Sequence, residues 1–346
     1  MAVAYPRELS VAGWAARHRE DGVPGRWPYG LDRLGRPDTS VRVLDLAPDD
    51  RAHRAWARVA RRRLVDADLV LTWDENAAGR LGRQWRAMEH GSGVVWLTDD
   101  VGGRFAEQQV DMLRRCAATW VLSDAQRDPL QQLLGPGHPV HVVRFGIDTT
   151  FFRPAPYPAR PVVFSAGNDR HRDTATLMSA LGLVHEAVPG AELLVQSQTT
   201  GTPPKGVTVV RDASHSGIRQ LHARAGVVAV ATHPNLHVSG MTVALEANAT
   251  GRPVVMTRTP GVEGYLRHGV DALLVPPHDP EALAAAVIRL LEDPRRAGSM
   301  GEAGRAKVER DHTEQTMADQ LLAVATAIVG HRSGDAAISA DPRGRE

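Results

Sequence analysis

Residues 227–255 read VVAVATHPNLHVSGMTVALEANATGRPVV, and this stretch decides the fold class. It opens with a continuous apolar run, passes through a loop that contains a proline, and resumes at Ser239-Gly240 as a helical pattern that stops at Gly251. A second apolar run follows at Val254-Val255. Continuous apolar runs separated by helices are typical of strands that are buried on both faces of a parallel sheet. The stretch therefore predicts a strand–helix–strand unit of an α/β fold.

The same alternation recurs along the chain. Apolar, β-branched runs occur at residues 41–44, 69–71, 94–97, 120–122 and 140–143, and again at 162–164, 192–195, 207–210, 227–230, 254–256 and 273–275. Two such series predict two doubly wound α/β domains. Residues 151–158 hold three prolines in five positions, which favours a stiff linker. We expect domains at 1–150 and 159–312, a helix at 313–329 that packs back toward the N-terminal domain, and a disordered tail at 330–346.

Composition excludes several classes of protein. The 346 residues carry 41 basic and 40 acidic side chains, a formal charge of +1, which argues against a dedicated nucleic-acid binder. No apolar run is long enough to span a bilayer, and the first residues lack the apolar core of a signal peptide. The single cysteine, Cys116, excludes a disulfide framework and a cysteine-rich metal site. We expect a cytoplasmic protein.

The helix that starts near Gly240 suits a phosphate. Ligands of parallel α/β sheets bind beyond the carboxyl ends of the strands, and a helix N-terminus there offers unpaired N–H groups and a positive dipole end. Ser239 can cap this helix, and Gly240 lets a ligand approach the backbone. Glu246 lies six residues on, about 9 Å along the axis, where its carboxylate could accept two sugar hydroxyls. A nucleotide fits this pattern; alternatively, Glu246 faces solvent and Ser239-Gly240 merely begins a helix.

Several ordered motifs add a family resemblance. They are RFGIDTTFFRP (144–154), FSAGNDRHRDTATLMSAL (164–181), GVVAVATHPNLHVSGMTVALEANATGRPVV (226–255) and GVEGYLRHGVDALLVPPHDPEALAAAVIRLL (261–291). From about residue 144 to residue 316 the chain resembles the retaining GT-B glycosyltransferases of family 4. The resemblance implies two Rossmann-like domains facing a central cleft, with the acceptor on the N-terminal domain and a nucleotide sugar on the C-terminal one.

The resemblance also implies roles for individual residues. Glu246 matches the glutamate that binds the nucleotide ribose. Arg170 and Arg172 lie where the family holds the pyrophosphate, although solvated arginines are the alternative. The remaining donor-side candidates are the backbone groups of Ser239, Gly240 and Met241, with Gly167 permitting close approach. If the arginines and the helix dipole carry the charge of the leaving group, no metal and no further cofactor is required.

One departure puts the donor sugar in doubt. The family usually has a second glutamate eight positions before the ribose glutamate, and this chain has Val238 there. Either a deoxygenated or modified sugar is used, or backbone groups take over, or His237 substitutes. A degenerate, inactive transferase is a further alternative, and so is a nucleotide-sugar 2-epimerase of the same fold.

The N-terminal half offers weaker signals. After the first strand comes a long insert at residues 7–26, and Trp27, Tyr29 and Gly30 follow it as candidate acceptor contacts; a surface loop packed by its aromatic side chains is the alternative. Asp99 and Asp100 follow the run at 94–97, where the resemblance implies a catalytic pair facing the donor sugar, unless they cap the next helix. Asp74-Glu75 is a similar pair for which capping is the favoured interpretation.

Two further patterns complete the sequence analysis. An arginine stripe at helical spacing could contact an anionic membrane, but we favour a solvated helix face; it comprises Arg51, Arg54, Arg58, Arg61 and Arg62. The 15 histidines show no metal set, because Pro234 keeps His233 and His237 off a common helix face. We therefore expect a glycosyltransferase whose partners are a nucleotide-sugar donor and a small-molecule, lipid or glycan acceptor, with no nucleic acid.

Overall fold

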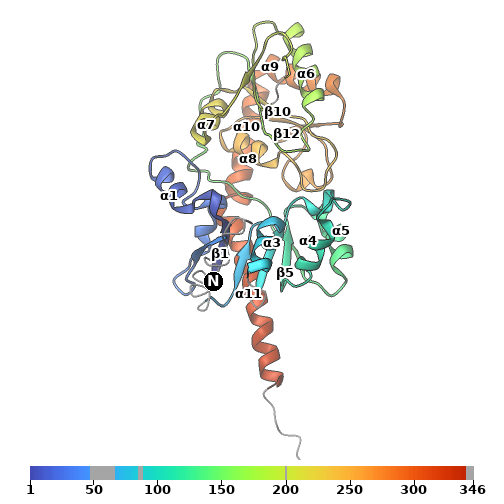
Figure 1. Cartoon of the computed structure of the whole chain (residues 1–346). Coiled ribbons are helices and arrows are strands. Elements are labelled where there is room, and N and C mark those ends of the chain that lie inside the picture. The colour runs from blue at the N-terminus through green and yellow to red at the C-terminus, as the bar shows by residue number, and fades with distance from the viewer. Residues whose placement is uncertain (47–66, 85–88, 199–200, 340–346) are drawn as a thin grey trace, which may run out of the picture. The chain divides into compact units, whose positions relative to one another are not determined.

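The computed structural model describes residues 1–46, 67–84, 89–198 and 201–339, and its contacts divide the chain into two compact units. The first comprises Met1–Trp14, Leu31–Val143 and Met317–Glu346, and the second comprises Ala15–Gly30 and Arg144–Thr316. Each unit is built on one six-stranded sheet, and the strands within each sheet pair in parallel (Figure 1). The predicted α/β fold with two doubly wound parallel sheets is confirmed.

The first unit has the strand order β2-β1-β3-β4-β5-β6. Its strands are β1 (Ala2–Pro6), β2 (Arg42–Leu46), β3 (Val70–Thr72), β4 (His90–Val94), β5 (Ala118–Val121) and β6 (Val140–Val142). Its helices are α3 (Glu75–Gln84), α4 (Ala106–Leu113), α5 (Asp124–Leu134) and most of α11 (Glu314–Ser339), with short 3-10 turns at η1 (Arg7–Leu9) and η3 (Leu97–Asp99). The helix α11 extends beyond the predicted end at residue 329 and includes part of the expected tail.

Strand β4 lies four residues before the predicted run at 94–97, so that prediction was wrong. The strand HGSGV contains two glycines, which no apolar pattern reveals. A Cβ on Gly93 would overlap the carbonyl oxygen of Trp73, and one on Gly91 would lie 3.1 Å from Ile328 of α11. The glycines let Trp73 and α11 approach the strand backbone, and the apolar residues after it turn into η3 instead.

The second unit has the strand order β12-β11-β10-β7-β8-β9. All six predicted strands form: β7 (Val162–Ala166), β8 (Glu192–Gln196), β9 (Val207–Val210), β10 (Val227–Val230), β11 (Val254–Thr257) and β12 (Ala272–Val275). The helices are α6 (Thr174–Ala187), α7 (His215–Arg224), α8 (Met241–Ala249), α9 (Pro280–Glu292) and α10 (Pro294–Asp311), with η4 at Val262–Gly264. Side chains of α6 and α9 form one apolar core with one face of the sheet, and α8 packs on α10.

The chain reverses its winding direction at β7. Because β7 pairs with β8 on one side and with β10 on the other, the loops that follow β7 and β10 leave the sheet side by side at its carboxyl edge. Such a switch point is where doubly wound sheets bind their ligands. The fold thus brings the segments 167–173 and 231–240 together.

The arginine stripe at residues 51–62 lies outside the described residues. Among the helices that the structure does describe, none combines the length and the apolarity that a bilayer crossing needs.

A buried pair of basic side chains ties α10 to the segment that precedes β7. Lys307 Nζ donates to His312 Nε2 over 2.8 Å, so the ring donates from Nδ1, which lies 3.3 Å from the carbonyl oxygen of Phe145. Both side chains are nearly inaccessible to solvent. Burial, reinforced by the Lys307 ammonium, lowers the pKa of His312 to about 4.

This pair makes stability pH-dependent. Between about pH 4 and the usual histidine pKa near 6.5, His312 is protonated in the unfolded chain but not in the folded chain. The free energy of unfolding therefore falls as the pH falls through this range. We expect the wild type to lose about 2 kcal/mol more than His312→Gln between pH 7 and pH 5. Urea unfolding at both pH values measures this, and equal losses in the two proteins would contradict it.

Candidate functional site

The two switch-point loops meet around the guanidinium of Arg172. Gly167 follows β7 with φ +126°, Gly240 precedes α8 with φ +91°, and a Cβ on either glycine would overlap that guanidinium. The backbone of Arg172 forms an antiparallel bridge with Thr232 of the β10 loop, which ties the two loops together at this residue. The sequence candidates Gly167, Arg172 and Gly240 therefore lie together. Arg170 is exposed on the same loop.

Arg172 is a half-buried positive charge without a full set of acceptors. Its Nε is shielded from solvent and finds no hydrogen-bond partner among the described residues. Burial lowers the pKa of Arg172 to about 10, opposed by the nearby carboxylates of Asp169 and Glu246, so the side chain still carries its charge at neutral pH. A guanidinium in such a position favours an anionic ligand, because leaving a buried donor unpaired is costly.

Glu246 lies on α8 beside this charge and is held by a histidine. Its Oε2 is 3.2 Å from His222 Nε2 of α7, and His222 is fully buried against the rings of Phe152 and Phe164. The carboxylate is 14% exposed, and its Oε1 accepts no hydrogen bond from the described residues. The contact keeps one carboxylate oxygen oriented and leaves the other available to a ligand.

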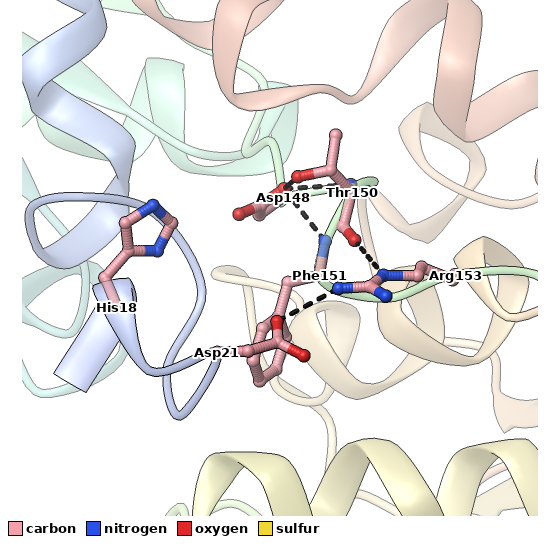
Figure 2. A pocket seen from close by; sticks show the side chains of 6 residues that line it. All are labelled: His18, Asp21, Asp148, Thr150, Phe151 and Arg153. Carbon is pink, nitrogen blue, oxygen red and sulfur yellow. Dashed lines mark hydrogen bonds and ion pairs between the residues drawn. The ribbon is translucent and has the colours of Figure 1, made fainter.

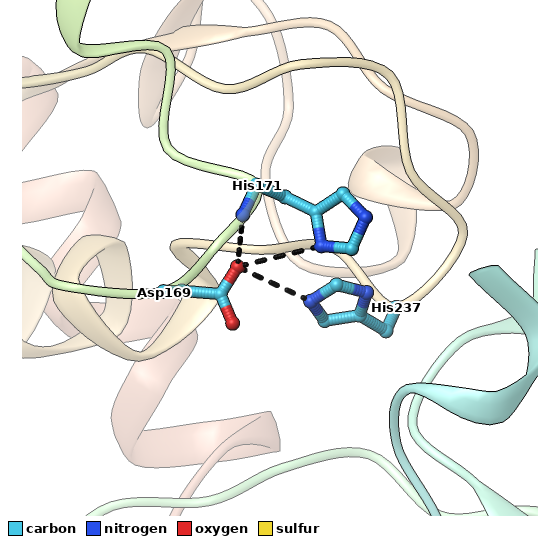
Figure 3. A group of neighbouring side chains, drawn as sticks. All are labelled: Asp169, His171 and His237. Carbon is cyan, nitrogen blue, oxygen red and sulfur yellow. Dashed lines mark hydrogen bonds and ion pairs between the residues drawn. The ribbon is translucent and has the colours of Figure 1, made fainter. Parts of the chain in front are cut away.

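Ser239 does not cap α8, contrary to expectation. The N-cap is Gly240 without a side-chain hydrogen bond, and the Ser239 hydroxyl instead donates to Asp169 Oδ1 over 2.7 Å. The same oxygen accepts from the backbone N–H of His171 and has His171 Nδ1 and His237 Nε2 at 3.6 and 3.7 Å (Figure 3). Burial alone would raise the pKa of Asp169, but the His237 and Ser239 contacts lower it well below its usual range.

The backbone at the start of α8 is already partly engaged. The N–H of Ser239 donates to Asn235 Oδ1 and that of Met241 donates to the carbonyl of Val238. The N–H of Gly240 makes no hydrogen bond with the described residues, so of these three groups it is the one open to a ligand. Val238 itself is buried in a left-handed conformation with φ +54°.

Comparison with known proteins agrees with this geometry. Residues 169–293, which include the loop of Arg172 and the helix of Glu246, match the model of the family described as glycosyl transferases group 1. Glycogen synthase of Mycobacterium tuberculosis is 27% identical over 311 residues, which cover 84% of this chain and 68% of that protein. Over these residues the chain is similar to the glycosyl transferases of group 1, and its relatives support glycosyltransferase activity.

Solved structures show the architecture of the glycosyltransferase. Sucrose-phosphate synthase of Thermosynechococcus elongatus matches it with a TM-score of 0.70 at 18% identity, covering 95% of this chain and 99% of that one. HepE of Anabaena, solved with UDP-glucose, also gives a TM-score of 0.70 at 15% identity, covering 94% of this chain and all of that one. The fold is GT-B, as the sequence predicts.

The candidate acceptor residues of the glycosyltransferase belong to the second unit. Helix α1 (Val11–Arg19) lies within the insert and the turn η2 (Pro28–Leu34) follows it. The backbone N–H of Gly25 in the insert donates to Asp148 Oδ2. Tyr29 is exposed, Trp27 is half-buried, and Gly30 is left-handed with no room for a Cβ beside Glu314. These three residues therefore form a packed turn that presents Tyr29 to solvent.

A small cavity opens beside the insert. It has a volume of about 220 Å³ and is lined by His18, Asp21, Asp148, Thr150, Phe151 and Arg153 (Figure 2). Although burial opposes it, hydrogen bonds from Thr150, Gly25 and Phe151 lower the pKa of Asp148. Asp21 pairs with Arg153 and Arg219 at 3.1 and 2.9 Å. The carboxylates here join the insert to the segment after β6.

In the first unit, Asp99 and Asp100 end the turn η3, and neither caps α4, whose N-cap is Phe105. Asp74 does cap α3, accepting from the N–H groups of Asn76 and Ala77. The buried Glu75 carboxylate accepts from three successive N–H groups, those of Val95, Trp96 and Leu97. Glu75 thus holds the loop that carries Asp99, a role that the sequence argument did not assign.

The sequence argument also missed His222 and Asp169. Histidine 222 lies 24 residues before its partner and on another helix, so nothing in the sequence links the two. Asp169 carries a weak signal, since it follows β7 in the same loop as the two predicted arginines.

The close packing at Gly240 gives a test. We expect Gly240→Ala to displace the Arg172 guanidinium and to weaken binding of a nucleoside diphosphate at least about tenfold, the loss of one charged hydrogen bond. Gly251→Ala is the matched control, because Gly251 is also left-handed (φ +75°) but has nothing within 4 Å of an added Cβ. Calorimetric titration of both variants with a nucleoside diphosphate measures this difference. Equal affinities of Gly240→Ala and Gly251→Ala for the nucleotide would contradict the placement of Arg172.

Proposed function

We propose that this glycosyltransferase moves a sugar from a nucleoside-diphosphate donor to an acceptor hydroxyl, with the nucleotide bound at the switch point of the second unit. The observation that carries the proposal is the Arg172 guanidinium, which packs against two glycines and whose Nε is shielded from solvent and lacks an acceptor among the described residues. A diphosphate supplies the missing acceptors and the opposite charge, and guanidinium geometry suits phosphate oxygens.

The same contacts explain how the reaction is promoted. The diphosphate gains negative charge as its bond to the sugar breaks, and a fixed guanidinium beside a helix N-terminus stabilises that charge without reorganising. Arg170, exposed on the same loop, can close over the phosphate. With these groups carrying the charge, the transfer step requires no metal.

Glu246 is proposed to bind the ribose of the nucleotide. It follows the helix N-terminus by six residues, and His222 orients its carboxylate from behind. A carboxylate that presents one oxygen to the site can accept a hydroxyl hydrogen bond and so select a ribonucleotide. His222 then acts as a positioning residue, since it would touch Glu246 and not the ligand.

The finer features of the activity are also proposals. Retention at the anomeric carbon rests on the motifs shared with family 4, and the product's anomeric configuration tests it. Asp99 and Asp100 are proposed to face the transferred sugar, and Trp27, Tyr29 and Gly30 are proposed to lie on the acceptor side. A small molecule, lipid or glycan is the proposed acceptor, and the cytoplasm is the proposed compartment, consistent with one buried cysteine.

Removing the Glu246 carboxylate tests the nucleotide assignment. We expect Glu246→Ala to weaken binding of a ribonucleoside diphosphate by about 1–3 kcal/mol, because a buried charged hydrogen bond is lost. A 2′,3′-dideoxyribonucleoside diphosphate should bind both proteins alike in the same calorimetric titration. Unchanged ribonucleotide affinity, or an equal loss with the dideoxy compound, would remove Glu246 from the ribose site; melting without ligand checks that the variant folds.

Removing both arginines tests the leaving-group role. Replacing Arg170 and Arg172 together by alanine should depress release of nucleoside diphosphate from the donor far more than it depresses binding of the free nucleoside. Arg114→Ala, an exposed change in the first unit, is the control. If the nucleoside without phosphates loses affinity as much as turnover falls, the arginines do not act on the diphosphate.

A further inference from the structure

A second cluster of chemistry-bearing side chains lies at the carboxyl edge of the same sheet. It joins Asp173, which follows β7, His233, which follows β10, and His278, which follows β12. Asp173 Oδ2 lies 2.9 Å from His278 Nδ1 and 3.6 Å from His233 Nδ1, and the three atoms lie within 4.8 Å of one another. Three separate loops therefore aim one ligand atom each at a common point.

These distances suit a metal ion. A tetrahedral ion with bonds of about 2.1 Å holds its ligand atoms about 3.4 Å apart, which small ring rotations would achieve here. Two imidazoles and one carboxylate form a ligand set of intermediate softness, which favours Zn²⁺, Co²⁺ or Ni²⁺ over Mg²⁺ and Ca²⁺. The imidazoles are 47% and 56% exposed, so an ion can enter and solvent can complete its coordination.

The carboxylate is oriented by groups that would remain in place. Asp173 is the N-cap of α6: its Oδ1 accepts from the Thr176 N–H and its Oδ2 accepts from the Thr176 hydroxyl. Oδ2 has one further acceptor position, which His278 Nδ1 occupies at 2.9 Å and which a bound ion would take over. Outer hydrogen bonds such as those from Thr176 typically fix metal-ligating carboxylates. His278 is held in a left-handed conformation (φ +58°) immediately before the N-cap of α9.

The neighbouring cluster of Asp169, His171 and His237 lacks this opening. Its central oxygen, Asp169 Oδ1, already accepts short hydrogen bonds from the Ser239 hydroxyl and the His171 N–H. Both lone pairs of that oxygen are therefore used, and the rings at 3.6 and 3.7 Å complete a hydrogen-bonded cluster. His233 and His237 therefore belong to two different clusters, although the sequence analysis considered them as one pair.

We propose that Asp173, His233 and His278 form a binding site for a Zn²⁺-like divalent ion. The ion would join the loops after β7, β10 and β12 and so steady the segment that carries Arg172, the residue before Asp173. Its role is structural, and it does not depend on the identity of the sugar, the base or the acceptor.

Co²⁺ is the probe for the site. Tag-free, full-length protein is stripped with a chelator and titrated with Co²⁺, whose visible absorption reports nitrogen and oxygen coordination. We expect one equivalent to bind, Zn²⁺ to displace it, and Zn²⁺ to raise the melting temperature. His278→Ala and Asp173→Asn should each weaken Co²⁺ binding at least about tenfold. Asparagine keeps the cap of α6, so Asp173→Asn separates metal loss from misfolding.

His237→Ala is the matched control, because it alters the other cluster and should leave Co²⁺ binding unchanged. The proposal is overturned if the wild type binds no Co²⁺, if Asp173→Asn binds it as tightly as the wild type, or if His237→Ala abolishes binding. Binding of nucleoside diphosphate to the same samples reports the proposed function separately.

Discussion

A guanidinium packed between two glycine backbones is the constraint on which the rest of the second unit depends. Arg172 can occupy this position only because neither Gly167 nor Gly240 has a side chain, and only because β7 and β10 are neighbours. The strand order places the two loops together, and the glycines bring them into contact. Shielding the guanidinium charge from solvent costs free energy unless an anion pairs with it, and a phosphate is an anion that suits this position.

Carboxylates organise the surroundings of this charge, each through a different set of donors. Glu246 is oriented by a fully buried histidine, and Asp169 gathers a hydroxyl, an amide and two imidazoles. In the first unit, Glu75 fixes three consecutive amides of the loop before Asp99. Asp169 and Glu75 thus each hold the conformation of a loop that follows a strand. The polar residues at these sheet edges therefore contribute to structure as well as to candidate chemistry.

The sequence predicts the second unit better than the first for a physical reason. Its strands are uninterrupted β-branched runs, such as those of β7 and β10, and the apolar signal locates them correctly. The apolar pattern does not locate strand β4, because Gly91 and Gly93 replace apolar residues there. These glycines make room for Trp73, Trp120 and α11, and such contacts join residues far apart in the chain. The Ser239 hydroxyl was expected to cap α8, but a partner 70 residues away competes for it. The local pattern identifies Gly240 and Glu246 as candidates and the family resemblance adds Arg172, whereas the pairing of Glu246 with His222 arises only from tertiary packing.

The most direct measurement is a crystal structure of the protein soaked in turn with UDP, GDP, ADP and dTDP. The account predicts that one of them binds with its diphosphate against the Arg172 guanidinium and the Gly240 N–H, and with its sugar hydroxyls on Glu246. A nucleotide bound elsewhere, with Arg172 still lacking an anionic partner and Glu246 in contact only with His222, would contradict it.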